Sequence, residues 1–152
     1  FFLKQIKDYN NSERRRRFYI ETIIYESIQI KGLPRIIETN TNLFKEKDIP
    51  LYYVSEFIEG KQLDDYIQLN TPNEEEIIVL FEQLLKILSD CHERNVIHRD
   101  IKPENIIVKD GEIYLVDFGI SYYPEAAIKN LTKVGIEIGN RFLRLPEHSA
   151  GS

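Results

Sequence analysis

The chain has 152 residues, a formal net charge of -5 at pH 7, 42% hydrophobic residues and 30% charged residues, a composition typical of one ordinary globular domain. Its single cysteine, Cys91, excludes an intrachain disulfide and a cysteine-based metal cluster, and it fits a reducing, cytoplasmic compartment. No apolar run approaches the ~20 residues that cross a bilayer. We therefore expect no membrane span, and the acidic balance argues against nucleic acid as the main partner.

The first half of the chain predicts a small sheet with one helix. Residues 1–7 are mostly apolar and predict a short strand, and the polar residues after them predict a loop, in which Ser12 is a candidate helix cap. Apolar residues then recur at helical spacing over residues 13–30, where glycine and proline end the pattern. Residues 35–38 and 51–56 predict two further strands, joined by a turn-rich segment.

The second half begins with two predicted helices. Residues 63–69 are a short helix candidate. The clearest helix start lies at residues 71–74, where a threonine cap, a proline in the first helical position and a glutamate three residues beyond the cap match a capping box. A long helix to about residue 93 should follow, with one wide apolar stripe facing the core. The stripe consists of Ile77, Ile78, Phe81, Leu84, Leu85, Leu88 and Cys91.

A hairpin and a long irregular segment complete the chain. Residues 106–108 and 113–116 predict strands on either side of Asp110-Gly111, a strong two-residue hairpin signal. Residues 120–152 contain Gly135, Gly139, Pro146 and scattered charges, and they show no periodic pattern. Such a long loop in a domain usually carries function.

Two short motifs beside this hairpin carry the chemistry. The first is residues 98–105, His-Arg-Asp-Ile-Lys-Pro-Glu-Asn, and the second is Asp117-Phe118-Gly119, which begins twelve residues after Asn105. The first motif resembles the catalytic loop of protein kinases, and the second resembles their metal-binding motif. The spacing inside the first motif and the hairpin between the two motifs match that family as well.

The resemblance implies a role for each polar residue of the two motifs. Asp100 would accept or orient the proton of the attacking hydroxyl, and Lys102 would place its ammonium near the moving phosphoryl group. Asn105 and Asp117 would supply the hard oxygen ligands that Mg²⁺ prefers. A lysine at position 102 is typical of the serine/threonine-specific members of the family. We expect His98 to be a structural residue that packs beneath the phenylalanine of the second motif.

The resemblance extends to the hinge that joins the two lobes of these enzymes. Residues 51–60 are similar to the last strand of the small lobe and the hinge, whose backbone groups bind the adenine edge of ATP. Ser55 would be the gatekeeper, and the backbones of Glu56 and Ile58 would face adenine. Ile107, on the first strand of the hairpin, would also contribute to the nucleotide site.

Lys4 and Glu21 resemble the ion pair that holds the α- and β-phosphates in this family. Lys4 lies on the first predicted strand and Glu21 on the first predicted helix, with room between them for a loop and about two helical turns. An exposed lysine and a helix-surface glutamate are the alternative, because charged side chains are usually exposed.

The arginines at residues 14–17 allow two interpretations. A solvated helix face is the simpler one. The alternative is an anion site that, together with Arg99, receives a phosphorylated side chain, since guanidinium groups bind phosphate through two hydrogen bonds. The candidate acceptors are Thr132, which is best placed, and Ser121, Tyr122 and Tyr123.

Some positions depart from the family pattern. No glycine-rich phosphate loop is present, and if Lys4 is assigned correctly we expect that loop to precede residue 1, so the chain resembles a truncated catalytic domain. Phe2 stands where the family usually has an alanine under the adenine ring. Residues 145–147 resemble the end of the activation segment, with Leu145 in place of alanine, and Asn140 replaces a common threonine.

The resemblance implies an α+β, bilobal, protein-kinase-like fold that is incomplete. Residues 1–55 would be the small-lobe portion, with a small antiparallel sheet and helix C. Residues 56–60 would be the hinge, and residues 61–152 would be the large-lobe portion with the catalytic loop and the activation segment. The implied function is ATP- and Mg²⁺-dependent phosphoryl transfer to serine or threonine hydroxyls of protein substrates.

Two other functions stay open. A pseudokinase, in which the fold serves binding or scaffolding, is favoured by Phe2 and by the missing glycine-rich loop. A kinase of small-molecule hydroxyls is disfavoured by Lys102 and by the segment at residues 145–147, which such enzymes usually lack.

Overall fold

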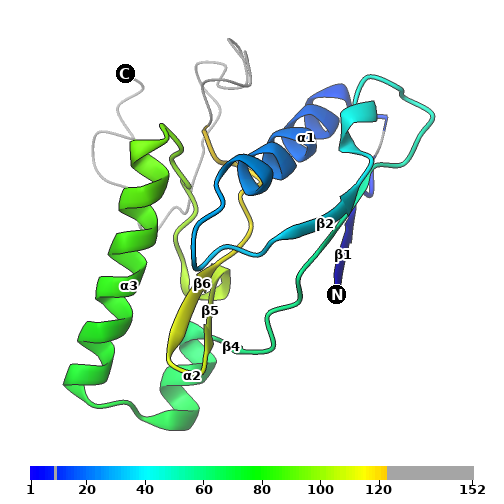
Figure 1. Cartoon of the computed structure of the whole chain (residues 1–152). Coiled ribbons are helices and arrows are strands. Elements are labelled where there is room, and N and C mark those ends of the chain that lie inside the picture. Colours follow the sequence, from blue (N-terminus) through cyan, green and yellow to red (C-terminus); the bar gives the residue numbers. More distant parts are fainter. Residues whose placement is uncertain (9, 123–152) are drawn as a thin grey trace, which may run out of the picture.

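Two antiparallel sheets, each of three strands, organise the part of the chain that the computed structural model describes, residues 1–8 and 10–122. The first sheet has the strand order β1-β3-β2, and the second has the order β4-β5-β6 (Figure 1). The strands are β1 (Phe2–Gln5), β2 (Ile36–Thr39), β3 (Tyr52–Ser55), β4 (Lys61–Gln62), β5 (Ile106–Lys109) and β6 (Glu112–Leu115). The helices are α1 (Ser12–Ser27), α2 (Leu63–Asn70) and α3 (Glu74–Glu93), and the 3-10 turns are η1 (Thr41–Leu43) and η2 (Pro103–Asn105).

The first sheet packs against α1, and the two form the upper right part of Figure 1. The central strand β3 pairs antiparallel with β1 and β2. The ring of Phe18 on α1 stacks on Tyr53 of β3, with the ring centroids 5.3 Å apart. This contact belongs to a buried apolar cluster that continues into the second sheet and α3.

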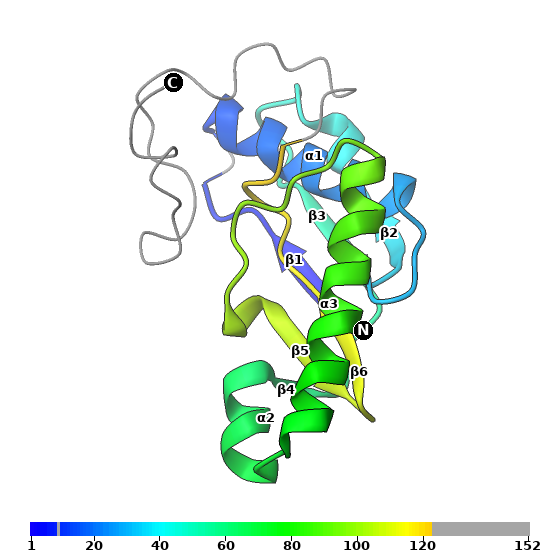
Figure 2. The same cartoon turned by 90° about the vertical axis from the view of Figure 1, so that its left-hand side faces the viewer.

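The second sheet packs against α3, which runs alongside it in both views (Figures 1 and 2). Asp110 and Gly111 connect β5 to β6 with φ values of 51° and 77°, the left-handed conformations that the two-residue hairpin predicts. Gln83 of α3 holds this hairpin, because its amide donates to the Gly111 carbonyl at 2.8 Å and accepts from the Ile113 N–H at 3.0 Å.

The segment between α1 and β2 joins the two parts of the fold. The N–H of Leu115 on β6 donates to the Gly32 carbonyl at 2.8 Å. Gly32 has a φ of 93°, and a Cβ there would overlap the Ile87 side chain of α3 and lie 3.0 Å from the Ile113 carbonyl oxygen. Only glycine fits this position without strain.

The caps of α1 and α3 differ from the predicted ones. Asn11, rather than Ser12, caps α1, since its side chain accepts from two backbone N–H groups of the first turn, both at 3.0 Å. Asn73, rather than Thr71, caps α3, and it forms a reciprocal capping box with Glu76. Thr71 instead ends α2 in a left-handed conformation with a φ of 43°, so it is not available to start the next helix.

The buried face of α3 also differs from the predicted stripe. The residues of α3 that are buried are Leu80, Leu84, Ile87 and Cys91. Phe81 and Leu85, both predicted to face the core, are 58% and 59% exposed. The helix is apolar over a wide arc, and its contact with β6 selects which part of the arc is covered. Across residues 1–8 and 10–122, no helix combines the length and apolar character that a membrane span requires.

Candidate active site

A cavity of ≈ 280 Å³ lies between the first sheet, the connection after β3 and the β5-β6 hairpin. The predicted nucleotide residues Lys4, Glu56, Ile58 and Ile107 line it together with Asp117. The remaining lining residues are Phe2, Tyr25, Pro34, Tyr53, Ser55, Phe57 and Val116. The cavity is mostly apolar, with polar groups gathered at its Lys4 end, which is typical of a pocket for a small organic ligand.

The first sheet presents one face to this cavity. Side chains alternate along a strand, so Phe2 and Lys4 of β1 point the same way. Their partners directly across on β3 are Ser55 and Tyr53, and all four residues line the cavity. The bulky Phe2 therefore faces the small Ser55, and the charged Lys4 faces Tyr53.

Lys4 bridges two carboxylates that lie far apart in the sequence. Its Nζ lies 2.7 Å from Glu21 Oε1 on α1 and 2.9 Å from Asp117 Oδ1. Burial alone would lower the pKa of Lys4, but the two carboxylates outweigh burial and raise the pKa above its ordinary value. Lys4 is therefore a fixed positive charge at one end of the cavity.

Glu21 is 1% exposed, so its carboxyl needs partners within the protein. Lys4 supplies the charge, and the Tyr53 hydroxyl donates to Glu21 Oε1 at 2.9 Å. Burial raises the pKa of Glu21, and the lysine and the tyrosine oppose that rise. The alternative of an exposed helix-surface glutamate is wrong for this residue.

The connection after β3 contributes Glu56, Phe57 and Ile58 to the cavity lining, and its backbone is partly hydrogen-bonded within the protein. The N–H of Glu56 donates to the Arg35 carbonyl, and the carbonyl of Ile58 accepts from the Gly60 N–H, both at 2.9 Å. The Ser55 hydroxyl donates to the Glu56 carbonyl at 3.2 Å. A carbonyl oxygen has two lone pairs, so the Glu56 carbonyl can accept a second hydrogen bond from a ligand.

The loop between α3 and β5 gathers the predicted catalytic residues. Lys102 Nζ lies 2.8 Å from Asp100 Oδ2. The Asn105 amide nitrogen donates to the Asp100 carbonyl oxygen at 2.9 Å and to Asp100 Oδ2 at 3.0 Å. Both amide hydrogens of Asn105 are thus used to fix Asp100, and its amide oxygen is the atom that can accept or coordinate.

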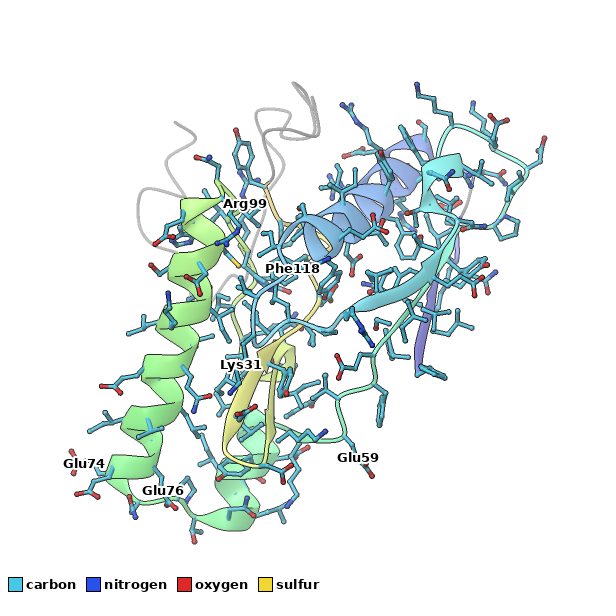
Figure 3. The ribbon with its side chains drawn as sticks, in the orientation of Figure 1. Lys31, Glu59, Glu74, Glu76, Arg99 and Phe118 are labelled. Carbon is cyan, nitrogen blue, oxygen red and sulfur yellow. The ribbon has the colours of Figure 1, made fainter. Side chains whose placement is uncertain are left out.

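His98 and Phe118 form the support beneath these residues. Phe118 is buried between α1 and α3 (Figure 3), and its ring meets His98 edge-on with the centroids 4.5 Å apart. The prediction that His98 packs beneath Phe118 is confirmed. Burial lowers the pKa of His98 below its ordinary value, although its bond to the Val116 carbonyl and the charge of Asp100 oppose this.

Asp117 has an uncommon backbone conformation with a φ of 63°. Its N–H donates to the Tyr25 hydroxyl at 2.9 Å, and its carboxylate meets Lys4. Burial alone would raise the pKa of Asp117, but Lys4 and the Gly119 N–H outweigh burial and hold the pKa below its ordinary value. The carboxylate therefore stays ionised and partly exposed, at 48% of its side-chain surface.

Tyr25 and Tyr53 are site residues that sequence reasoning missed. Each is buried, and each hydroxyl contacts a charged or strained part of the site. Burial raises the pKa of both phenols, so both stay protonated. A signal existed: Tyr25 lies one helical turn after Glu21, and Tyr53 lies two residues before Ser55 on the same face of a strand.

The donor set fits a magnesium ion that is completed by phosphate and water. Asp117 offers an ionised carboxylate and Asn105 an amide oxygen. The Val116 N–H donates to the Asn105 carbonyl at 2.9 Å, so the backbones of the two motifs lie side by side. Within residues 1–8 and 10–122, no cluster of three or more His, Cys, Asp or Glu side chains is arranged to hold a metal. A Mg²⁺ site with one or two protein ligands matches this ion's preference for keeping water and phosphate oxygens.

The arginines at residues 14–17 do not form one solvated face. Arg15 is 0% exposed, and its guanidinium donates to backbone carbonyls of residues 43–49, at the end of η1 and in the segment that leads to β3. Arg14 lies 3.6 Å from Asp8 at the surface. Arg99, near the C-terminal end of α3 in Figure 3, lies over the Tyr122 ring at 5.0 Å. Tyr123, Thr132, Asn140 and residues 145–147 lie outside the described residues.

Residues 1–137 match the family model for the protein kinase domain. The chain belongs to the protein kinase family. The fold agrees with this assignment: the small antiparallel sheet with α1, the connection after β3 and part of a helical lobe form an α+β, bilobal kinase fold that is incomplete.

Several curated kinases are similar to this chain. Serine/threonine-protein kinase PrkC of Bacillus subtilis is 32% identical over 144 residues, which are 93% of this chain and 21% of that protein. Sperm motility kinase 2B of Mus musculus is 40% identical over 93 residues, or 60% of this chain and 18% of that protein. Serine/threonine-protein kinase PAK mbt of Drosophila melanogaster is 34% identical over 113 residues, which are 74% of this chain and 17% of that protein. The chain thus spans about a fifth of the length of these relatives.

Proposed function

We propose that this chain carries the nucleotide site and the catalytic loop of an ATP- and Mg²⁺-dependent protein kinase that phosphorylates serine and threonine hydroxyls of proteins. The observation that carries this proposal is the bridge from Lys4 to both Glu21 and Asp117, at 2.7 and 2.9 Å. It brings a cation from one sheet to a carboxylate beside the catalytic loop, at the end of a cavity large enough for a nucleobase.

Lys4 provides the phosphate end of this site. Glu21, which accepts from the Tyr53 hydroxyl, holds the lysine from one side, and Asp117 holds it from the other. A phosphate oxygen that enters beside Lys4 would meet a charge that is already positioned, which is how phosphoryl transfer is mainly catalysed. Asp117 and Asn105 would hold Mg²⁺, which neutralises developing charge on the phosphate oxygens when it is bound.

Asp100 provides the hydroxyl end. Asn105 fixes its carboxylate and its backbone carbonyl, and Lys102 neutralises part of its charge. A carboxylate held in this way can accept a hydrogen bond from the attacking hydroxyl and orient its oxygen. Lys102 would then lie beside the transferred group and stabilise its charge. Lys102 and the names of the similar kinases support a serine/threonine acceptor.

Ile107, Glu56 and Ile58 provide the base end. Ile107, Glu56 and Ile58 all line the cavity, which supports this part of the proposal: Ile107 would be an apolar wall, and the Glu56 and Ile58 backbones would face the base. An adenine ring has hydrogen-bonding groups on its edge and apolar faces, which matches this arrangement. In this proposal residues 1–55 are the small-lobe portion, residues 56–60 the hinge and residues 61–152 the large-lobe portion, and the protein works in the cytoplasm.

Asp100→Asn and Asp117→Asn test the proposal in the full-length protein. Transfer of labelled phosphate from ATP to a serine/threonine peptide should fall roughly 10²–10⁴-fold in Asp100→Asn, the range for a lost acid-base group. Asp117→Asn should fall at least as far, with a higher Mg²⁺ requirement. Asp110→Asn makes the same chemical change in the exposed hairpin turn, where asparagine also accepts a left-handed φ, and should keep full activity. Equal activity in all three variants would refute the assignment.

A scaffolding function remains a second candidate, because Phe2 occupies cavity wall beside the nucleotide position. Binding separates the two candidates. MgATP at 100 times its dissociation constant should add ~2.7 kcal/mol to the free energy of unfolding. A full-length protein that neither shifts its unfolding with MgATP nor transfers phosphate would be a scaffold.

A further inference from the structure

Asp117 has to be held in place by its surroundings. A non-glycine residue with a φ of 63° is strained, and such residues persist only where several contacts determine them. The side chain of Asp117 is held by Lys4 of β1. The backbone conformation of Asp117 depends on other groups, which form hydrogen bonds with the backbone of residues 116–118.

Most backbone bonds of this segment come from the catalytic loop and its neighbourhood. The Val116 N–H donates to the Asn105 carbonyl at 2.9 Å, and the Val116 carbonyl accepts from His98 Nε2 at 3.0 Å. The Phe118 carbonyl accepts from the Ser121 N–H at 3.0 Å. The N–H of Asp117 is different, because it donates at 2.9 Å to a side chain of α1, the Tyr25 hydroxyl.

Tyr25 is itself firmly placed. It is 5% exposed, its ring meets Phe118 edge-on with the centroids 5.2 Å apart, and it lies 6.2 Å from the ring of Tyr53. It also lies one helical turn after Glu21, on the same face of α1. One face of α1 therefore carries both the partner of Lys4 and the acceptor for the Asp117 N–H.

We propose that the Tyr25 hydroxyl is a positioning residue for the Asp117 carboxylate: it couples the position of α1 to the direction in which Asp117 presents its oxygens to the metal and phosphate. This inference rests on the proposed function for its catalytic meaning, and on geometry alone for the anchor. The hydroxyl matters rather than the ring, because phenylalanine would keep the contact with Phe118 and would leave a buried N–H unpaired.

Tyr25→Phe in the full-length protein tests the anchor. Amide hydrogen exchange at Asp117 should become roughly five- to tenfold faster, as expected for one lost hydrogen bond. The Mg²⁺ concentration that half-saturates ATP binding should rise by a similar factor, while ATP binding measured without metal should change much less.

Thr22→Val is the matched control. It also removes a buried hydroxyl from α1, one that lies 2.6 Å from the Thr41 hydroxyl and does not touch Asp117. It should lower stability without changing exchange at Asp117 or the Mg²⁺ requirement. If Tyr25→Phe behaves like Thr22→Val in both readouts, the Tyr25 proposal is wrong. If exchange at Asp117 rises in a protein that does not transfer phosphate, the anchor stands and the proposed function fails.

Discussion

His98 is held in a single tautomer by its two neighbours. A backbone carbonyl can only accept, so Nε2 carries the proton that is donated to the Val116 carbonyl at 3.0 Å. Nδ1 then accepts from the Asp100 N–H at 3.2 Å. Protonation at Nδ1 would remove that acceptor and place a buried charge beneath Phe118.

The pH dependence of stability should therefore report His98. Burial lowers the pKa of His98 in the folded protein, so the unfolded chain takes up a proton first as the pH falls below ~6.5. The free energy of unfolding should decrease from there down to the lower folded pKa, with a slope of at most ~1.4 kcal/mol per pH unit. Glu21 acts in the opposite direction because its pKa is raised, so the comparison must be made between variants.

Urea unfolding of wild type and His98→Gln between pH 8 and pH 5 makes that comparison. Glutamine can donate and accept but does not ionise, so the variant should be less stable at pH 8 and should lose less stability on acidification. His92→Gln removes an exposed imidazole from α3 and should keep the slope that depends on His98. A slope that is unchanged in His98→Gln would contradict this account.

At the scale of single residues, the sequence predicts the roles of residues whose partners lie within the same short motif. The positions of Asp100, Lys102 and Asn105 follow from local spacing, and the structure brings them together. The roles of Tyr25 and Arg15 depend on contacts with residues far along the chain, at separations of 92 residues for Tyr25 and Asp117 and of 28 to 34 for Arg15 and its carbonyls. Helical spacing from Glu21 indicates the face of α1 on which Tyr25 lies, but no local pattern identifies the distant partners of Tyr25 or Arg15.

The start of α3 shows, at the scale of an element, that local sequence patterns alone do not decide the structure. Two overlapping capping-box patterns are present, Thr71 with Glu74 and Asn73 with Glu76, and both have the right spacing. The end of α2 decides between them, because Thr71 is used as its C-cap. In the same way, contact with β6 decides which part of the apolar arc of α3 is buried.

Two substitutions distinguish the observed cap from the predicted one. Asn73→Ala should lower the free energy of unfolding by about 1 kcal/mol, because it removes the acceptor for the Glu76 N–H. Thr71→Gly should be neutral or stabilising, since a β-branched residue at a φ of 43° is strained and glycine is not. Chemical denaturation checks both, and a cost at Thr71 without a cost at Asn73 would favour the predicted cap.

The whole molecule places its chemistry where two packed parts meet. The first sheet and α1 contribute Lys4, Glu21 and Tyr25, and the second part contributes Asp100 and Asp117. Lys4 and Tyr25 of the first part both bond to Asp117 of the second part, so the relative position of the two parts sets the distances in the site. The segment around Gly32 also connects the two parts, through the bond from the Leu115 N–H to the Gly32 carbonyl, and it leads to Pro34 of the cavity lining.

Gly32→Ala should weaken the contact between the Gly32 segment and the second part of the fold. The substitution combines a left-handed φ with overlap against Ile87, and we expect it to lower the free energy of unfolding by about 2–4 kcal/mol. Adding Ile87→Val removes the Cδ1 atom that the new methyl would meet. The double variant should therefore lose about 1 kcal/mol less free energy of unfolding than the sum of the losses in the two single variants.

The remaining cost of the double variant combines the left-handed φ with the contacts to Ile87 Cγ1 and the Ile113 carbonyl oxygen, because valine at position 87 removes only the Cδ1 contact and leaves φ unchanged. Strict additivity of Gly32→Ala and Ile87→Val would mean that the junction rearranges instead of holding its packing. In that case the two parts would not be fixed by this contact, and the ion pairs of Lys4 with Glu21 and Asp117 would have to align them.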